Sequence, residues 1–281
     1  MRLGIFAKTF TRPTLDAVLD AVADHGLGCV QFNFACAGWP SMPDRIYTAL
    51  ADRIRREMEK RKISMAAVSG TFNMIHPDPT IRRDGLRRLE ALASACRRLG
   101  TSVITLCTGT RNLENMWRHH PANDSPEAWR DLVAAMGEAL LIAEQHGITL
   151  GIEPEVNNVV DTALKARRLL DEMKSPRLKI IMDAANLFHA GDLPRMREIM
   201  HEAFAVLGRD IVLAHAKELN HDGHTGDLPL GQGALDWDYY LTLLRETNFT
   251  GPLIMHGISE RDVAASVSFL RRKLETVACR T

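Results

Sequence analysis

The sequence predicts one closed (β/α)8 barrel, a fold of class α/β, as a single domain over residues 1–281. Short apolar segments alternate with amphipathic segments eight times along the chain. The length is one at which α/β barrels commonly fold as a single domain. The first expected strand ends in Lys8-Thr9-Phe10-Thr11 and lacks the glycine-rich phosphate loop that we would expect in the competing open, doubly wound sheet. No linker or composition break divides the chain.

Eight segments have the length and apolar character of buried strands, and eight carry helical periodicity. The expected strands are residues 3–7, 29–34, 63–68, 102–107, 148–152, 179–182, 211–214 and 253–256. The expected helices are residues 16–25, 43–61, 82–99, 126–146, 162–173, 194–207, 237–247 and 263–276. Terminal signals support several of them: Gly26 and Gly100 end helices, and Ser125 caps a helix that starts with Pro126.

Two long loops interrupt this alternation, at residues 108–125 and 221–233. Long loops after barrel strands tend to be functional or mobile. The tract 221–224, His-Asp-Gly-His, resembles a metal-binding sequence, but its Gly and Asp content is also typical of a plain flexible loop, which is the interpretation we favour.

Composition narrows the class of partner and the compartment. Lys and Arg together number 35, as do Asp and Glu, so the net charge is zero and gives no general attraction to nucleic acid. Five cysteines are scattered without CxxC spacing, as is typical of free thiols in a reducing cytosol. The chain enters a strand at once without a signal peptide, and no apolar run is long enough for a membrane span. We expect a cytoplasmic protein that binds neither membranes nor nucleic acid.

Four of the expected strands end in a side chain that can bind a metal ion. These residues are Glu153, Asp183, His215 and His256. A carboxylate at the end of a buried strand needs a partner, and in a barrel the active site lies at the carboxyl ends of the strands. Alone, each residue could be a helix cap or half of a surface ion pair. Together they predict a site for a divalent ion such as Mn²⁺, Zn²⁺, Co²⁺ or Mg²⁺.

The second half of the chain resembles the xylose isomerase-like (β/α)8 superfamily. This superfamily contains sugar and sugar-phosphate isomerases and epimerases and also the type IV apurinic endonucleases. The resemblance covers roughly residues 148–258. It is carried by Gly-Ile-Glu-Pro-Glu at 151–155, Met-Asp-Ala-Ala-Asn-Leu at 182–187, His-Ala-Lys-Glu at 215–218, Gly-Gln-Gly-Ala-Leu-Asp-Trp at 231–237 and Gly-Pro-Leu-Ile-Met at 251–255.

The resemblance implies a metal ion held by Glu153, Asp183, His215 and a glutamate at the end of strand eight. This chain departs from that pattern, because His256 stands where the family usually has the glutamate. The two strand-end glutamates also form the acid/base pair of the sugar epimerases. Glu153 and His256 would therefore be the catalytic pair here, since histidine can act both as a ligand and as a base near neutral pH. Glu260 lies four residues later, but we expect it to open the last helix as a capping acid.

Five further residues are candidates for substrate contact, each with a plainer alternative. Glu155 would bind a hydroxyl or orient a ligand. Lys217 would bind an anionic oxygen, or else pair with Glu155 or Glu218. Asn186 would bind a sugar hydroxyl or cap the next turn. His76 would line the barrel mouth or be structural, and Trp117 would stack on a sugar face or act as a hydrophobic plug.

The leading functional hypothesis is a metal-dependent isomerase or epimerase of a small sugar, sugar phosphate or keto-polyol, acting through an enediolate. One alternative is a binding protein that kept the barrel and lost the strand-eight glutamate. A second is an apurinic endonuclease, which the neutral charge disfavours and for which Cys107 and Asn186 stand in place of two expected histidines. The resemblance also allows a homo-oligomer.

Overall fold

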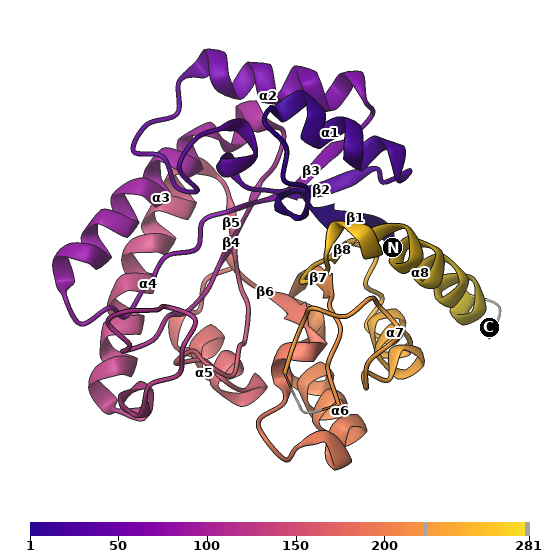
Figure 1. Cartoon of the computed structure of the whole chain (residues 1–281). Coiled ribbons are helices and arrows are strands. Elements are labelled where there is room, and N and C mark those ends of the chain that lie inside the picture. Colours follow the sequence, from indigo (N-terminus) through magenta and orange to yellow (C-terminus); the bar gives the residue numbers. More distant parts are fainter. Residues whose placement is uncertain (222–223, 279–281) are drawn as a thin grey trace.

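The structure is a computed structural model that describes residues 1–221 and 224–278. Eight parallel strands close into a barrel, because β8 pairs with β1 as well as with β7, and the helices surround it (Figure 1). The predicted fold class is therefore confirmed. The strands are β1 (Arg2–Phe6), β2 (Cys29–Phe32), β3 (Ser64–Ser69), β4 (Val103–Leu106), β5 (Thr149–Ile152), β6 (Leu178–Asp183), β7 (Ile211–Ala216) and β8 (Pro252–Met255). The helices are α1 (Leu15–Asp24), α2 (Thr48–Lys60), α3 (Pro79–Leu99), α4 (Pro126–His146), α5 (Ala163–Met173), α6 (Met196–Leu207), α7 (Trp237–Glu246) and α8 (Val263–Ala278).

All predicted boundaries but one lie within three residues of the observed ones, and the larger differences have local causes. The helix predicted from residue 43 begins only at Thr48, because the five residues before it form an irregular entry to the helix. The strand predicted over 29–34 ends at Phe32, since Asn33 caps a short 3-10 turn instead. Conversely, α3 starts earlier than expected, with Asp78 as the N-cap and Pro79 in the first turn.

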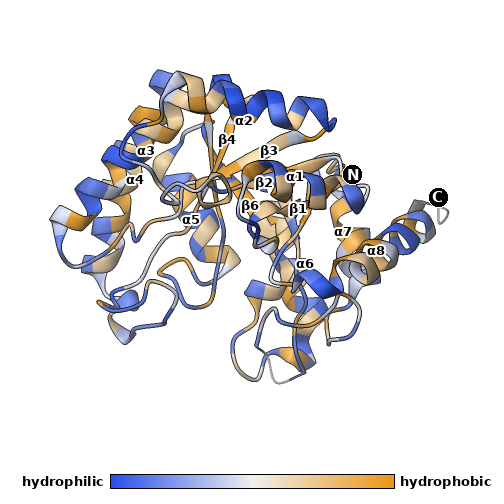
Figure 2. Ribbon diagram, turned by 45° about the horizontal axis from the view of Figure 1, so that its top comes forward, coloured by the Kyte–Doolittle hydropathy of each residue, from blue (hydrophilic) through white to orange (hydrophobic). Residues whose placement is uncertain are grey.

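Each outer helix turns an apolar face to the strands. Figure 2 shows hydrophobic residues along the strands, while the outer helix α2 is largely hydrophilic. Four cysteines, Cys29, Cys36, Cys96 and Cys107, are buried and free, as expected, whereas Cys279 lies outside the described residues.

Of the helices in the described ranges, none is both long and apolar enough to cross a membrane.

The lower part of the barrel interior is an apolar plug. Inward-facing residues from several strands pack there, among them Cys29, Ala67, Ile181, Leu213 and Ile254. Two strands contribute glycine instead. A Cβ atom on Gly4 would lie 2.5 Å from Cys29 Sγ, and one on Gly151 would lie 2.4 Å from Ile181 Cδ1. The sequence thus supplies small residues where the plug leaves no further space.

Two residues further along seven of these strands, the inward position carries a polar side chain. We call this set the polar cluster; its members are Gln31, Ser69, Thr105, Glu153, Asp183, His215 and His256. The eighth strand, β1, contributes Phe6 at the same step, and its ring lies 5.3 Å from the His256 ring. Because side chains alternate across a strand, residues two positions apart point to the same side. The inward side chains therefore change from apolar to polar within two residues toward the carboxyl ends of the strands. The polar cluster is the floor of the cavity described next.

Candidate functional site

A cavity of about 590 Å³ opens above the polar cluster, at the carboxyl ends of the strands. Every member of the cluster except Asp183 lines it. Loops add Lys8, Asn33, Ser41, Thr71, Met116, Trp117, Glu155, Asn157, Asn186, Lys217 and Thr225. The cavity therefore combines buried polar groups on its floor with the aromatic side chain of Trp117, which lies on a loop and is 52% exposed. This combination is typical of a binding site for a small polar molecule.

Asp183, His215 and His256 form a cluster that could hold a metal ion. Each of them offers one ligand atom, and these atoms lie within 4.8 Å of one another. Three of their atoms, Asp183 Oδ2, His215 Nδ1 and His256 Nδ1, are buried without a hydrogen-bond partner among the described residues. A buried polar atom without a partner is costly, so three close together fit a position that a cation would complete.

Glu153 adjoins the same point from β5. Its Oε1 atom lies 3.4 Å from His215 Nδ1, and Asp183 Oδ2 lies at the same distance from that nitrogen. The His256 ring stacks on the His215 ring, with centroids 4.9 Å apart and planes inclined by 8°. The structure thus brings together all four side chains that the sequence suggested as metal ligands.

The two histidines differ in charge in the absence of a cation. Although burial disfavours a charged ring, the adjacent Glu153 and Asp183 carboxylates raise the pKa of His215 to about 9. Burial, reinforced by the charges of His215 and Lys217, lowers the pKa of His256 to about 3. Burial also opposes ionisation of Asp183, yet Lys217 and His215 hold the pKa of this carboxyl below its usual range. Asp183 is therefore ionised and His256 is neutral, which are the forms that bind metal ions, whereas His215 is charged in the absence of a cation and would have to lose a proton to bind one.

Asn186 and Lys217 are linked to Glu153 in a chain of hydrogen bonds. Asn186 Nδ2 donates to Glu153 Oε1 at 2.6 Å, and Asn186 Oδ1 accepts from Lys217 Nζ at 2.7 Å. Asp183, not Asn186, caps the turn that follows β6. Lys217 contacts neither Glu155 nor Glu218 directly but lies 3.9 Å from Asp183 Oδ2. Of the two roles expected for Asn186, capping is therefore wrong, and in this structure its amide orients Glu153.

Glu155 shares the cavity with Glu153 but is held by its own loop. Asn157 Nδ2 and Asn158 Nδ2 donate to its two carboxylate oxygens at 2.9 and 2.5 Å. Burial and the neighbouring Glu153 carboxylate raise the pKa of Glu155 to about 7, against the opposing effect of Lys217. A carboxyl with such a pKa changes charge near neutral pH.

This pKa predicts a pH dependence of stability. A raised folded-state pKa means that the stabilisation is complete below the unfolded value of 4.5 and is lost as pH rises through about 7. The difference between the folded and unfolded pKa values corresponds to about 3 kcal/mol of folding free energy. The unfolding free energy of the metal-free protein, measured with urea, should be lower at pH 8 than at pH 4.5. In the Glu155→Gln variant this decrease should be smaller by about 3 kcal/mol. An identical fall in both proteins would contradict the assignment.

Three of the side chains considered from the sequence lie away from the cavity. His76 is not among the residues that line the cavity, because its Nδ1 accepts from the Asp78 backbone at the start of α3. Glu260 opens the short 3-10 turn (Glu260–Asp262) that leads into α8, at the start of the last helix where it was expected, and it pairs with Arg12. Glu218 is fully buried and accepts from the backbone N–H groups of three loop residues and from Trp237 Nε1, so it holds the β7–α7 loop. The tract 221–224 lies partly outside the described residues.

Three of the seven members of the polar cluster, those from β2, β3 and β4, were not predicted from the sequence. Gln31 Nε2 donates to Ser69 Oγ and Thr105 Oγ1, each at 3.3 Å, and Gln31 Oε1 lies 2.9 Å from His215 Nε2. A signal was present, because a glutamine inside the apolar segment 29–34 needs hydrogen-bond partners when it is buried.

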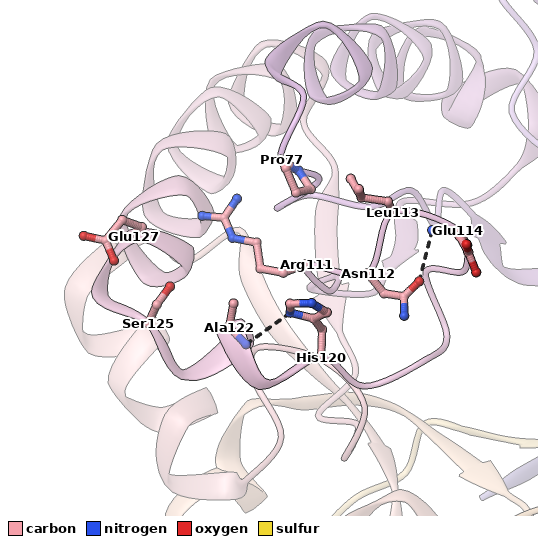
Figure 3. Close-up of a pocket in the computed structure, with 9 residues that line it drawn as sticks. All are labelled: Pro77, Arg111, Asn112, Leu113, Glu114, His120, Ala122, Ser125 and Glu127. Atoms are coloured by element: carbon pink, nitrogen blue, oxygen red, sulfur yellow. Dashed lines mark hydrogen bonds between the residues drawn. The ribbon is translucent and has the colours of Figure 1, made fainter.

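A second, larger hollow lies outside the barrel mouth (Figure 3). It is lined mainly by residues of the β4–α4 loop, with Pro77 from the β3–α3 loop and Glu127 from α4, and has a volume of about 710 Å³. Its polar groups have protein partners: Arg111 pairs with Asp131 at 2.7 Å and donates to the Ile75 carbonyl, while His120 Nδ1 accepts from the Ala122 N–H. The barrel cavity, with its orphaned polar atoms, is therefore the better candidate for a functional site.

Comparison with known proteins assigns the family. Residues 19–273 match the family described as "Xylose isomerase-like TIM barrel". The chain belongs to this family. The resemblance inferred from the motifs of the second half is thus confirmed and extends over most of the chain.

Relatives of this xylose isomerase-like barrel include sugar epimerases. The chain is 22% identical to the uncharacterized protein MJ1311 of Methanocaldococcus jannaschii, over 99% of this chain and 90% of that protein. It is 23% identical to L-ribulose-5-phosphate 3-epimerase UlaE of Shigella flexneri, over 70% of this chain and 64% of that protein. A solved structure of a D-tagatose 3-epimerase-like protein superposes with a TM-score of 0.78 at 16% identity, covering 100% of this chain and 99% of that one. This structural likeness shows the fold.

Proposed function

We propose that this barrel is a divalent-metal-dependent isomerase or epimerase of a small sugar, sugar phosphate or keto-polyol. The observation that carries the proposal is the group of three buried, unpartnered ligand atoms on Asp183, His215 and His256, with Glu153 beside them, under an open cavity. The relationship to L-ribulose-5-phosphate 3-epimerase supports a sugar as the substrate class. The four buried free cysteines favour a cytoplasmic location.

In this proposal, Glu153, Asp183, His215 and His256 hold the cation. A divalent ion in such a site supplies Lewis-acid polarisation of a substrate carbonyl. The protein's own part is to move a proton. Glu153 would take it from the carbon beside the carbonyl, since Asn186 already holds Oε1 and leaves the second oxygen for the substrate.

Residues around the cavity would position the substrate. Lys217 is half-buried beside Asp183 and offers its ammonium group to an anionic oxygen. Glu155 would accept from a hydroxyl, and the exposed indole of Trp117 would cover an apolar sugar face. The neutral imidazole of His256 would serve as a ligand. Its pKa of about 3 in the metal-free site makes this ring a weak base, so we assign proton abstraction to Glu153.

The test begins with metal analysis of the purified protein and continues with proton exchange. Protein loaded with Mn²⁺ or Co²⁺ is incubated in D₂O with a panel of ketopentoses, ketohexoses, their phosphates and inososes, and deuterium uptake is followed by NMR. We expect uptake at the carbon next to the carbonyl for at least one compound. Metal binding without exchange into any of them would contradict the proposal.

That contrary outcome would favour the alternative of a sugar-binding protein without catalysis. The observation behind this alternative is His256, which replaces a carboxylate at the end of β8 and whose pKa is lowered to about 3. Nicking of abasic DNA by the same preparation would instead favour the endonuclease alternative. Cys107, in place of one expected histidine there, is buried and its Sγ donates to the Phe72 carbonyl.

A further inference from the structure

Gln31 reaches across the barrel from β2 to His215 on β7. Gln31 is 4% exposed and His215 is 1% exposed, so water does not compete for their contact. Gln31 Oε1 lies 2.9 Å from His215 Nε2. No other hydrogen bond in the described part of the chain engages the ring of His215. Whatever fixes the orientation of this ring therefore acts through Gln31 and the two carboxylates on its other side.

The Gln31 amide is itself held in one orientation. Its Nε2 group donates to the hydroxyl oxygens of Ser69 and Thr105, both 3.3 Å away and both buried. With the amide nitrogen bound to these two acceptors, the amide oxygen faces His215. His215 Nε2 must then carry a hydrogen to donate, so the lone pair of the neutral ring resides on Nδ1, which lies 3.4 Å from Glu153 and from Asp183.

The backbone near Gln31 is also irregular. The register between β2 and β3 shifts between Val30 and Gln31, so that Gln31 pairs with Ala67 rather than with Ala66. Such irregularities re-aim side chains near functional sites. Gln31 thus lies opposite Ala67, and its amide reaches Ser69 two residues further along β3, Thr105 on β4 and His215 on β7.

We propose that Gln31 is a positioning residue: it holds His215 with Nε2–H toward β2 and Nδ1 toward the carboxylates, where a cation would bind. The part of this proposal that concerns the cation rests on the metal site of the proposed function, while the ring orientation does not. Partners of this kind typically change metal affinity by about 10- to 100-fold when they are removed.

The test compares Gln31→Met, which keeps the volume but removes the acceptor, with Gln31→Glu, which restores it. Ser69 and Thr105 can turn their hydroxyl hydrogens toward the new carboxylate, so the second variant keeps its contacts. Mn²⁺ affinity is measured by chelator competition on full-length protein. We expect Gln31→Met to bind about 10- to 100-fold more weakly than wild type and Gln31→Glu to bind at least as tightly as wild type. Thr105→Val, which removes one of the two anchors of the amide, is the matched control and should change the affinity far less.

A second readout does not need a metal ion. In ¹⁵N-edited NMR of metal-free protein, the Nε2–H proton of His215, assigned by its loss in His215→Asn, should be protected from exchange in wild type and in Gln31→Glu. It should be unprotected in Gln31→Met. Should Gln31→Met fail to fold, the wild-type and Gln31→Glu spectra still decide, because an unprotected Nε2–H in wild type overturns the proposal.

The outcomes separate this proposal from the proposed function. Equal Mn²⁺ affinity of wild type and Gln31→Met overturns the positioning role while leaving the metal site in place. Absence of Mn²⁺ binding by wild type rejects the metal site, and the NMR readout then decides the orientation of His215 by itself.

Discussion

Glu153→Gln should lose turnover by about 10²- to 10⁴-fold or more, because the variant cannot take up a proton from the substrate. The amide oxygen of Gln can still accept from Asn186 Nδ2, so the packing of the site should be preserved. Metal affinity should fall as well, since a charged oxygen 3.4 Å from His215 Nδ1 becomes neutral. The measurements are solvent-exchange rate, Mn²⁺ affinity and unfolding free energy of the variant.

Glu155→Gln is the matched control for this prediction. Glu155 lies two residues later and lines the same cavity, but its carboxylate is bound by Asn157 and Asn158 rather than placed beside His215. It should therefore keep wild-type metal affinity. If Glu153→Gln turned over at a near-normal rate, Glu153 would have no place in the mechanism. If both variants lost metal affinity equally, the loss would result from the removed negative charge in the cavity and not from a specific contact of Glu153 with the cation.

His256→Glu should raise the affinity for Mn²⁺ about tenfold or more. It adds a negative charge beside the cation position, and a unit charge near 4 Å contributes on the order of 1–4 kcal/mol in water or a partly buried site. About 1.4 kcal/mol corresponds to tenfold in affinity. Carboxylate oxygens also suit Mn²⁺ better than a neutral imidazole does. Chelator competition, repeated with Mn²⁺, Co²⁺ and Zn²⁺, measures the affinity and the change in preference.

His256→Leu is the companion variant. It keeps an apolar contact for Phe6 and removes the ligand atom, so metal affinity should fall. Unchanged affinity in both His256 variants would place His256 outside the coordination sphere and leave its stacking on His215 as its only role. A rise in His256→Glu that is accompanied by faster solvent exchange would indicate that a strand-eight carboxylate also improves proton transfer.

Local sequence patterns were sufficient to predict the strand ends that carry the four candidate metal ligands. Glu153, Asp183, His215 and His256 each follow a short apolar segment, and in a parallel barrel the ends of all strands meet on one face. The predicted cap Ser125 is local in the same way, because a cap binds the backbone within its own first turn: its side chain accepts from the N–H of Ala128, three residues later. The start of α2 was missed because the residues before Thr48 carry no side-chain cap that a sequence pattern could reveal.

The partners of polar side chains were beyond reach of the sequence. Lys217 could have paired with Glu155 or Glu218, but the fold places Asn186 within 2.7 Å of it and surrounds Glu218 with loop N–H groups. Gln31 and His215 are 184 positions apart in the chain, and only closure of the barrel brings them to 2.9 Å.

The sequence by itself determined the (β/α)8 barrel and the four polar side chains at the carboxyl ends of its strands, because the hydrophobic period and the residue that ends each strand are properties of neighbouring residues. Only the tertiary structure decided which of their atoms remain unpartnered, which amide orients Glu153 and which supports His215. Those choices depend on distances between strands that are remote in sequence, and no local pattern encodes them.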